Sequence, residues 1–181
     1  MGLVIAVCGM PASGKGEFAS ILASKGIPVR SMGDMVRAEV TSLGIEEGPN
    51  VFGEVATALR AEHGDDILAV RLTSAVDSLL DEHSIVLIEG MRGTAEKAVF
   101  VEHWGASFIS VAIIADTETR FQRVISRGRS EDGDRSTFQI RDERENGWGL
   151  DQIISEAEFT ISNNQEITEF TILVSDWLTS L

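Results

Sequence analysis

The chain has one cysteine, few prolines and no long apolar run, and each scarcity excludes a class of protein. Its single cysteine, Cys8, cannot form an intramolecular disulfide, which indicates a reducing compartment and a small buried side chain. No stretch approaches the roughly 18–20 apolar residues that a membrane-spanning helix requires. The first residues, Met-Gly-Leu-Val-Ile-Ala-Val-Cys, lack the basic leader of a secretory signal. We therefore expect a cytoplasmic protein with no membrane partner.

Basic residues are also scarce, because 15 Lys and Arg stand against 29 Asp and Glu and give a formal net charge of −14. Such a surface repels polyanions, so we expect no nucleic-acid partner. Most of the cations are arginines, and eight of the twelve lie between Arg92 and Arg144. A guanidinium can bind two phosphate oxygens at once. This local concentration therefore favours a phosphate site within an acidic protein.

The apolar pattern predicts one α/β domain over residues 1–181. Runs at 3–7, 85–88 and 108–114 lack polar alternation, as strands buried on both faces of a parallel sheet do. Shorter strands are predicted at 28–30 and 159–162. Helical patterns separate and follow the strands, at 15–24, 35–43, 52–62, 66–81, 94–103, 117–127 and 166–181. The alternation predicts a doubly wound, five-stranded parallel sheet.

Two segments fall outside the simple alternation. Residues 33–83 contain a helix-rich insertion between two predicted strands. Residues 128–149 are a polar stretch, and residues 130–140 within it have a central glycine and no metal-ligand pattern. A segment of this kind suits a short lid that closes over a bound ligand.

A glycine-rich loop carries the strongest functional signal. The glycines of Gly9-Met-Pro-Ala-Ser-Gly14-Lys15 are spaced so that consecutive backbone N–H groups can face a polyphosphate, with Lys15 as the mobile cation. The loop follows a buried strand and opens a helix, whose positive dipole end then lies under the phosphates. A glycine-rich turn without a ligand is the alternative. The expected phosphate contacts are Gly9, Met10, Pro11, Ala12, Ser13, Gly14, Lys15 and Gly16.

The same loop resembles that of adenylate kinases and related nucleoside monophosphate kinases. Gly16 stands where a general phosphate loop has Ser or Thr, and these kinases carry Gly-Lys-Gly-Thr. Glu17 replaces the threonine, which in the family touches the donor's phosphates. The resemblance implies that Glu17 lies at the ATP site, and a glutamate in the first helical turn facing solvent is the alternative.

Two further segments carry the resemblance. Ser31-Met-Gly33-Asp34-Met-Val-Arg37 is similar to the Ser-Thr-Gly-Asp-Met-Leu-Arg stretch of adenylate kinases, which implies that Gly33, Asp34 and Arg37 bind the acceptor. Met32 replaces the threonine there. The alternative makes Asp34 an N-cap with Arg37 as its neighbour three residues on.

Glu89-Gly90-Met91-Arg92 resembles the Asp-Gly-Phe-Pro-Arg segment of the same enzymes with one residue deleted. An acidic residue at the carboxyl end of a buried strand beside the phosphate loop is where the carboxylate that serves magnesium must lie. We therefore expect Glu89 to hold Mg²⁺ through water. The resemblance implies that Arg92 reaches the acceptor phosphate and takes part in catalysis.

The arginines of the lid region complete the candidate site. Arg120, Arg123 and Arg127 are spaced i, i+3 and i+7 and are expected to form a cationic stripe, with Phe121, Val124 and Ile125 turned toward the core. The resemblance implies catalytic roles for Arg123, Arg127 and Arg129 before the lid and for Arg141 and Arg144 after it. Surface ion pairs with Asp142, Glu143 and Glu145 are the alternative for the last two. Asn163 stands where such kinases contact the donor base, or where turn chemistry alone places it.

The resemblance covers nearly the whole chain and is closest to an archaeal-type group of adenylate-kinase-like and dephospho-CoA-kinase-like P-loop proteins. It implies a P-loop NTPase fold of the nucleoside monophosphate kinase kind, acting as a monomer or homodimer. The implied activity is phosphoryl transfer from ATP and Mg²⁺ to a small nucleotide acceptor, first a nucleoside monophosphate. One alternative is a dephospho-CoA or other small-molecule kinase, with Asp34 as the base. Another is an ATP-binding regulatory switch with weak ATPase activity.

Overall fold

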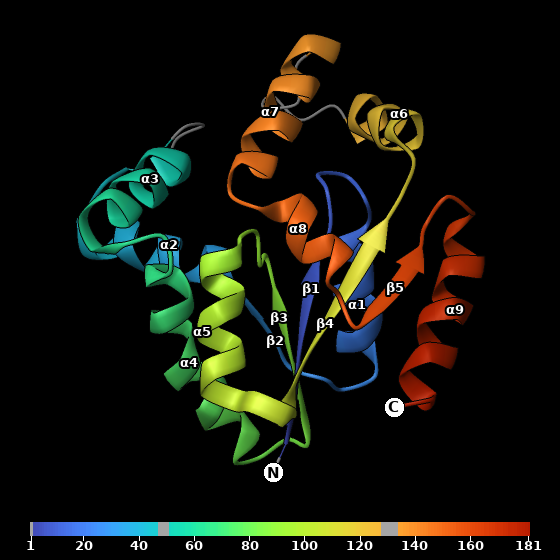
Figure 1. Ribbon diagram of the computed structural model, residues 1–181, viewed down its shortest axis with the longest axis horizontal. Helices are drawn as coiled ribbons and strands as arrows, with labels where there is room; N and C mark the ends of the chain where they lie inside the picture. The colour runs from blue at the N-terminus through green and yellow to red at the C-terminus, as the bar shows by residue number, and fades with distance from the viewer. Residues whose placement is uncertain (1, 47–50, 128–133) are drawn as a thin grey trace.

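The computed structural model describes residues 2–46, 51–127 and 134–181, in which strands and helices alternate (Figure 1). The strands are β1 (Leu3–Cys8), β2 (Val29–Ser31), β3 (Ile85–Glu89), β4 (Phe108–Ile114) and β5 (Phe159–Ser162). The helices are α1 (Lys15–Ser24), α2 (Met32–Ser42), α3 (Val51–His63), α4 (Ile67–Leu80), α5 (Thr94–Trp104), α6 (Thr117–Arg127), α7 (Arg135–Gly147), α8 (Leu150–Ser155) and α9 (Ile167–Thr179). A single 3₁₀ turn, Gly105–Ser107, joins α5 to β4.

The five strands form one parallel sheet in the order β2-β3-β1-β4-β5, which confirms the predicted doubly wound α/β fold. Val7 of β1 lies opposite Glu89 of β3, and Glu89 lies opposite Ser31 of β2. The carboxyl ends of these three strands are therefore level at one edge of the sheet. The turns that leave this edge are the turns that carry the candidate site.

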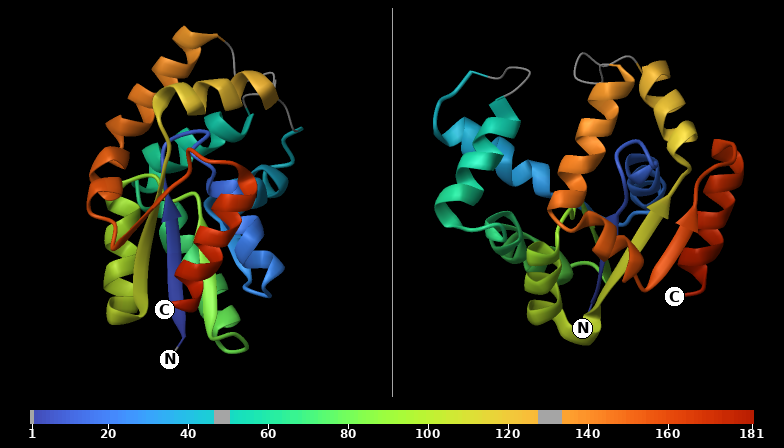
Figure 2. Two further views of the ribbon diagram at one scale, coloured as in Figure 1. Left: turned by 90° about the vertical axis from the view of Figure 1, so that its right-hand side faces the viewer. Right: turned by 45° about the horizontal axis from the view of Figure 1, so that its top comes forward.

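The central strand explains why the first apolar run shows no alternation. Val4, Ala6 and Cys8 of β1 belong to one hydrophobic cluster with buried residues of α4, α5 and α8. Ile5 and Val7 belong to a second cluster with buried residues of α1 and α9. Figures 1 and 2 show these helices as two layers on opposite faces of the sheet. Because both faces of β1 are covered, every residue from Val4 to Cys8 is fully buried.

The segment between β2 and β3 forms helices α2, α3 and α4, in the place predicted for the helix-rich insertion. Val36 and Val40 of α2 and Val55 and Leu59 of α3 join the same hydrophobic cluster as one face of β1. Helices α2 and α3 extend away from the sheet near its carboxyl edge (Figures 1 and 2). The insertion is thus anchored to the core while its outer helices reach beyond it.

Residues 135–147, inside the polar stretch 128–149 and outside the helices expected from the sequence, form α7; residues 128–133 lie outside the described ranges. The side chain of Asp134 accepts a hydrogen bond from the Thr137 amide at 2.9 Å and caps the helix. Phe138 is buried and packs on Phe121 of α6, with ring centroids 5.4 Å apart. Packing against α6 therefore stabilises a helix that the polar sequence of this segment does not indicate. Within the described ranges, every helix is too short or too polar to cross a bilayer.

Candidate functional site

The loop between β1 and α1 has the backbone conformation of a phosphate-binding turn. Gly9, Ala12 and Gly14 have positive φ angles of 151°, 62° and 108°. The Ser13 amide donates to the Met10 carbonyl at 3.1 Å and closes the turn. A Cβ on Gly9 would collide with the Ile113 carbonyl, and one on Gly14 would collide with the Asn163 amide. Both glycines are thus required by close approach as well as by conformation.

Lys15 opens α1 directly beneath this loop. Its ammonium group donates to the carbonyls of Gly9 and Met10 at 2.5 and 3.1 Å. Burial, helped by the charge of Arg92, lowers the Lys15 pKa to about 8, while Glu145 and Glu89 act in the opposite direction. Lys15 therefore shares one electrostatic environment with a cation and two carboxylates from distant parts of the chain.

Glu89 lies at the carboxyl end of β3, beside the first turn of α1. A Cβ on Gly16 would lie 4.0 Å from the Glu89 Oε1 atom, so this carboxylate faces the helix that carries Lys15. Among the described residues, no group of three or more His, Cys, Asp or Glu side chains could hold a metal ion. One carboxylate next to a phosphate loop suits Mg²⁺, which usually keeps its waters and takes further oxygens from phosphates. The residues present therefore fit the expected magnesium site.

Arg123 and Asn163 lie behind the phosphate loop and hold its backbone. Arg123 donates to the carbonyls of Ala12 and Ser13 at 3.4 and 3.3 Å and to that of Asn163 at 2.7 Å. The side-chain amide of Asn163 donates to the Ser13 carbonyl at 2.8 Å. Desolvation lowers the Arg123 pKa, which the charge of Glu17 opposes. Both side chains thus brace the loop, and their expected contacts with the donor stay predictions.

On α6 the expected core position of Ile125 is wrong, and one arginine of the cationic stripe is buried. Arg120 is only 4% exposed, whereas Ile125, which we placed toward the core, is 55% exposed. Arg120 donates to both carboxylate oxygens of Asp142 at 3.0 and 2.6 Å and to the Pro11 carbonyl at 3.1 Å. It therefore ties α6, α7 and the phosphate loop together, because its partners come from the latter two elements.

The other lid arginines are spread over separate places. Arg127 is exposed at the end of α6, Arg141 is half-buried on α7, and Arg144 is exposed near the end of α7. Arg129 lies outside the described residues. Glu17 is exposed on α1. The catalytic roles expected for Arg127, Arg129 and Arg141 stay predictions.

The first turn of α2 contains the expected acceptor residues Gly33, Asp34 and Arg37. The Ser31 hydroxyl accepts from the Gly33 amide at 3.1 Å, while Asp34 accepts from the Ser31 amide at 3.1 Å. The other Asp34 oxygen accepts from Arg37 at 3.0 Å, although the Arg37 side chain is 57% exposed. Asp34 thus forms a capping box, and Arg37 is its neighbour three residues on.

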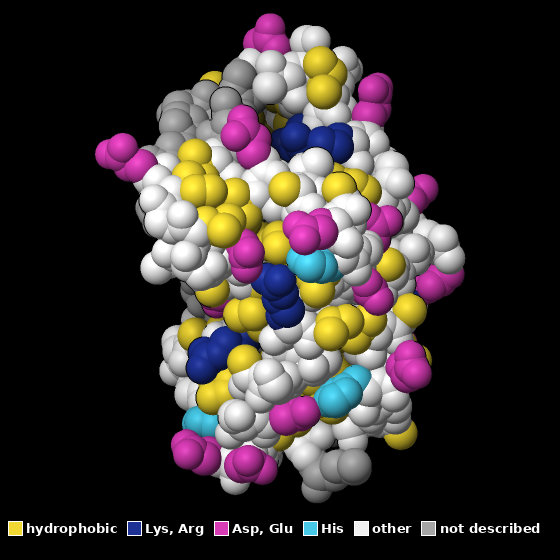
Figure 3. Space-filling model, turned by 90° about the vertical axis from the view of Figure 1, so that its left-hand side faces the viewer, with side chains coloured by type: hydrophobic (Ala, Val, Ile, Leu, Met, Phe, Trp, Pro, Cys, Tyr) yellow, Lys and Arg dark blue, Asp and Glu magenta, His cyan; other side chains and the backbone are white. Residues whose placement is uncertain are grey.

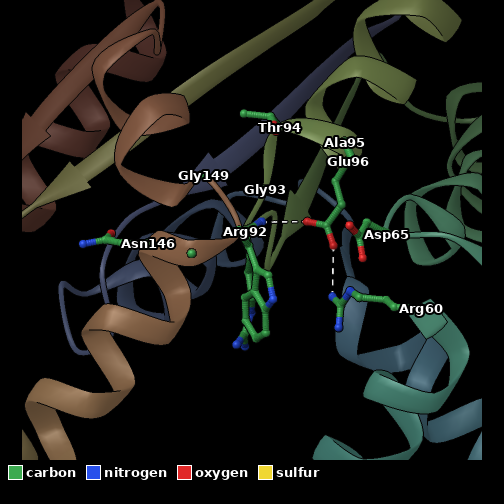
Figure 4. Close-up of a pocket in the computed structure, with 11 residues that line it drawn as sticks. Arg60, Asp65, Arg92, Gly93, Thr94, Ala95, Glu96, Asn146 and Gly149 are labelled. Carbon is green, nitrogen blue, oxygen red and sulfur yellow. Dashed lines mark hydrogen bonds and ion pairs between the residues drawn. The ribbon is translucent and has the colours of Figure 1, made fainter.

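A pocket of about 370 Å³ lies between α3, the β3–α5 turn and the α7–α8 turn (Figure 4). Arg92 lines it and donates to Glu145 of α7 at 2.7 Å. Arg60 lines it from α3 and donates to Glu96 at 3.1 Å. The guanidinium carbons of Arg60 and Arg144 lie 5.3 and 5.7 Å from the ring centroid of Trp148.

These cations are unusual for the surface around them. On the face that carries the insertion, Lys and Arg side chains are few and interspersed with acidic ones (Figure 3). Sequence analysis singled out Arg92 and missed Arg60, Glu96 and Trp148. No motif marks Arg60, since it belongs to an ordinary amphipathic helix. Glu96 had a weak signal, because it stands in the first turn of a helix, where acidic residues are common.

Together, the five-stranded sheet, the loop over Lys15 and the carboxylate on the neighbouring strand define a P-loop nucleotide-binding domain with a kinase-like fold. The chain belongs to the UPF0200 family. It is 41% identical over 179 residues to a UPF0200 protein of Methanoregula boonei, covering 98% of this chain and 97% of that protein. A UPF0200 protein of Hyperthermus butylicus is 44% identical over 171 residues, covering 93% and 89%. Residues 5–146 also match the family described as AAA domain.

Solved structures agree with the fold. Shikimate kinase from Acinetobacter baumannii, in complex with shikimate, superposes with a TM-score of 0.60 at 18% identity, covering 99% of this chain and 92% of that one. TT1252 from Thermus thermophilus superposes with a TM-score of 0.63 at 17% identity, covering 99% and 98%. At such identities the likeness concerns the fold alone.

Proposed function

We propose that this protein transfers a phosphoryl group from ATP, bound with Mg²⁺, to a small nucleotide acceptor, first a nucleoside monophosphate. One observation carries the proposal. Lys15 of the phosphate loop is within electrostatic reach of Glu89 and Arg92, and Arg92 in turn lines a separate pocket. A donor site and a second pocket that carries arginines, coupled electrostatically, are what phosphoryl transfer between two bound molecules requires.

Each residue has a role in this scheme. The amides of the 9–14 loop and the Lys15 ammonium bind the donor's phosphates. Glu89 holds the water shell of the magnesium ion, which when bound neutralises charge on the phosphates. Arg92 donates to the acceptor's anionic group and keeps it near Lys15. No covalent enzyme intermediate is needed, because positioning and charge neutralisation supply the catalysis.

The pocket favours an anionic acceptor of modest size. Arg60 and Arg92 line it together with Asp65 and Glu96, and each arginine can bind an anionic group. A monophosphate is already ionised, so it needs no general base. Asp34, the base considered for a hydroxyl acceptor, is held by the Ser31 amide and by Arg37. A volume of about 370 Å³ is near the lower end of the range for small-molecule sites, roughly 300–1,000 Å³. It suits a mononucleotide better than a coenzyme A precursor.

A panel assay tests the proposal. The protein is incubated with ATP and Mg²⁺ and with AMP, CMP, GMP, UMP or dephospho-CoA, and acceptor phosphorylation is followed together with ADP release. We expect one ATP consumed per phosphorylated monophosphate, with one ADP formed when the acceptor is CMP, GMP or UMP and two when it is AMP, and no reaction in EDTA. Phosphorylation of dephospho-CoA alone contradicts the monophosphate assignment. Slow ATP hydrolysis with no phosphorylated acceptor contradicts the kinase and favours a regulatory switch.

The depressed pKa of Lys15 predicts a pH dependence. Above pH about 8 the free protein loses the ammonium proton, so kcat/KM for ATP should fall as the pH rises through that value. Bound phosphates favour the charged form, so kcat should fall only at higher pH. Because the unfolded chain binds this proton up to about pH 10.5, the Lys15 contribution to the free energy of unfolding should rise with pH between the two values. A kcat/KM profile that stays flat through pH 9.5 contradicts the assignment.

A further inference from the structure

Glu96 is a buried carboxylate that connects two parts of the pocket wall. It lies in the first turn of α5 and is only 3% exposed. One oxygen accepts from the backbone amide of Arg92 at 2.7 Å, and the other accepts from the guanidinium of Arg60 at 3.1 Å. Figure 4 shows both contacts meeting at this carboxylate, one from Arg92 and one from Arg60. Residues 36 positions apart, on α3 and on α5, are thus joined at the pocket.

Fold stability alone does not account for this buried ion pair. Burial raises the pKa of Glu96, although the Arg92 amide and the Arg60 charge oppose the shift. Replacing a buried ion pair by well-packed apolar side chains is often neutral or stabilising. The Arg60 side chain is 15% exposed and lines the pocket, so the pair does not belong to the dry core. Its location therefore points to the ligand that the pocket takes.

The second carboxylate of the pocket has a different task. Glu145 binds the side chain of Arg92, whereas Glu96 binds the Arg92 backbone and the Arg60 side chain. The backbone of this turn is constrained as well, because a Cβ on Gly93 would lie 2.8 Å from the Trp148 carbonyl oxygen. Glu96 thus fixes the backbone at the start of the turn, and Glu145 fixes the direction of the Arg92 guanidinium. The remaining charged residue of the described pocket lining is Asp65, and the Arg144 guanidinium lies over the ring of Trp148, which also lines the pocket.

We infer that Glu96 is a positioning residue, which holds Arg60 and the Arg92 turn so that two guanidinium groups meet the anionic group of the acceptor. The inference rests on the proposed function, since the acceptor is the molecule that it positions. Arg60 is then a second acceptor-binding residue, supplied by the insertion rather than by the β3–α5 turn. The acceptor site is complete only when α3 is held against α5.

The test is Glu96→Gln, which keeps the shape of the side chain and removes its charge. We expect the acceptor KM, and the calorimetric Kd for the monophosphate, to rise about tenfold to a hundredfold, because small misplacements of binding groups have effects of this size. The ATP KM should change by less than about twofold, because the phosphate loop makes no contact with Glu96. Glu102→Gln is the matched control, since Glu102 is an exposed acid on the same helix.

Double substitution separates positioning from a general loss of structure. Arg60→Gln should raise the acceptor KM as Glu96→Gln does, and the effect of the double variant should be clearly smaller than the product of the two single effects, because both changes break the Arg60–Glu96 contact. Arg60→Lys, which keeps the charge and loses the fork geometry, serves if Glu96→Gln does not fold. Multiplicative effects, or equal rises in the KM of ATP and acceptor, overturn the inference.

The binding readout keeps the two proposals apart. If the wild-type chain phosphorylates none of the panel acceptors but binds AMP, CMP, GMP or UMP by calorimetry, the proposed function fails. The ratio of variant to wild-type Kd then still decides whether Glu96 positions the site. If the wild-type chain phosphorylates a monophosphate and Glu96→Gln leaves its KM and Kd unchanged, only the inference fails. A chain that binds no monophosphate overturns both.

Discussion

Replacing Lys15 by alanine should reduce phosphoryl transfer by at least about 10²–10³-fold, the usual effect of removing a preorganised group that stabilises transition-state charge. The ammonium is the only side-chain cation that opens α1, and it contacts two carbonyls of the phosphate loop. No neighbouring lysine can substitute for it, because the other two lysines are at positions 25 and 97. The measurement is steady-state ADP formation with the acceptor found in the panel.

The same variant should keep its fold. Burial lowers the Lys15 pKa to about 8, which means that the surrounding protein disfavours the charged form. Removing the ammonium therefore relieves an unfavourable interaction, and the Tm should stay level or rise at pH 7. Lys25→Ala is the control, because it removes an exposed lysine just after α1 and should leave activity unchanged. Retention of more than about a tenth of wild-type activity in Lys15→Ala would contradict the role of Lys15.

Arg120→Ala should produce the largest loss of stability. The Arg120 side chain is 5% exposed, and Asp142, its partner through two hydrogen bonds, is 17% exposed. Removing one member of a buried pair leaves the other charge uncompensated and lowers the free energy of unfolding by about 3–5 kcal/mol. Stacking is lost too, because the Arg120 guanidinium lies 5.0 Å from the ring centroid of Phe138. Urea denaturation at pH 7 measures the change.

The matched control is an exposed ion pair that joins the same two helices. Arg135 of α7 donates to Glu118 of α6 through two hydrogen bonds of 2.9 Å, but both side chains are more than half exposed. Water screens this pair, so Arg135→Ala should shift the urea midpoint little. Similar shifts in the two variants would show that the burial of the Arg120–Asp142 pair is not what stabilises the α6–α7 pair.

The sheet and the phosphate loop could be predicted from the sequence, because the local sequence patterns there agree with the tertiary structure. Each residue of β1 is apolar since each face of the sheet carries a helix layer. The spacing of Gly9 and Gly14 identifies the loop in the sequence. The close contacts at both positions are satisfied by glycine itself, so no other residue has to be known to predict them. Glu89 could be placed because parallel strands end level, which fixes the position of a residue at the end of β3.

Helix α7 was not predicted because its stabilising contacts are distant in sequence. Its polar composition hides the helix, while Phe138 contacts Phe121 and Asp142 contacts Arg120. The set of pocket residues predicted from the sequence was incomplete for the same reason. Arg60 and Glu96 are separated by 36 residues, and only the packing of α3 near α5 brings them together.

The spacing of residues along α6 also led to a wrong assignment of which side chains face the core and which face solvent. Arg120, Arg123 and Arg127 share a face, but a shared face need not be a solvent face. Two of them turn toward the phosphate loop, where carbonyl oxygens and Asp142 accept their hydrogen bonds. A guanidinium keeps its charge when it is buried, so an arginine pattern alone does not distinguish ligand binding from structural bracing.

The level carboxyl ends of the strands have a consequence for how this protein can diversify. Along the sheet edge, β2 leads into the insertion, β3 ends at Glu89, β1 leads into the phosphate loop, and β4 leads into the helix that braces it. In the proposed scheme, the segment after β2 serves the acceptor, the loop after β1 serves the donor, and the end of β3 between them supplies Glu89 to the donor side and Arg92 to the acceptor side. If that scheme holds, exchange of the segment between β2 and β3 among relatives would alter the acceptor while the donor half is inherited unchanged.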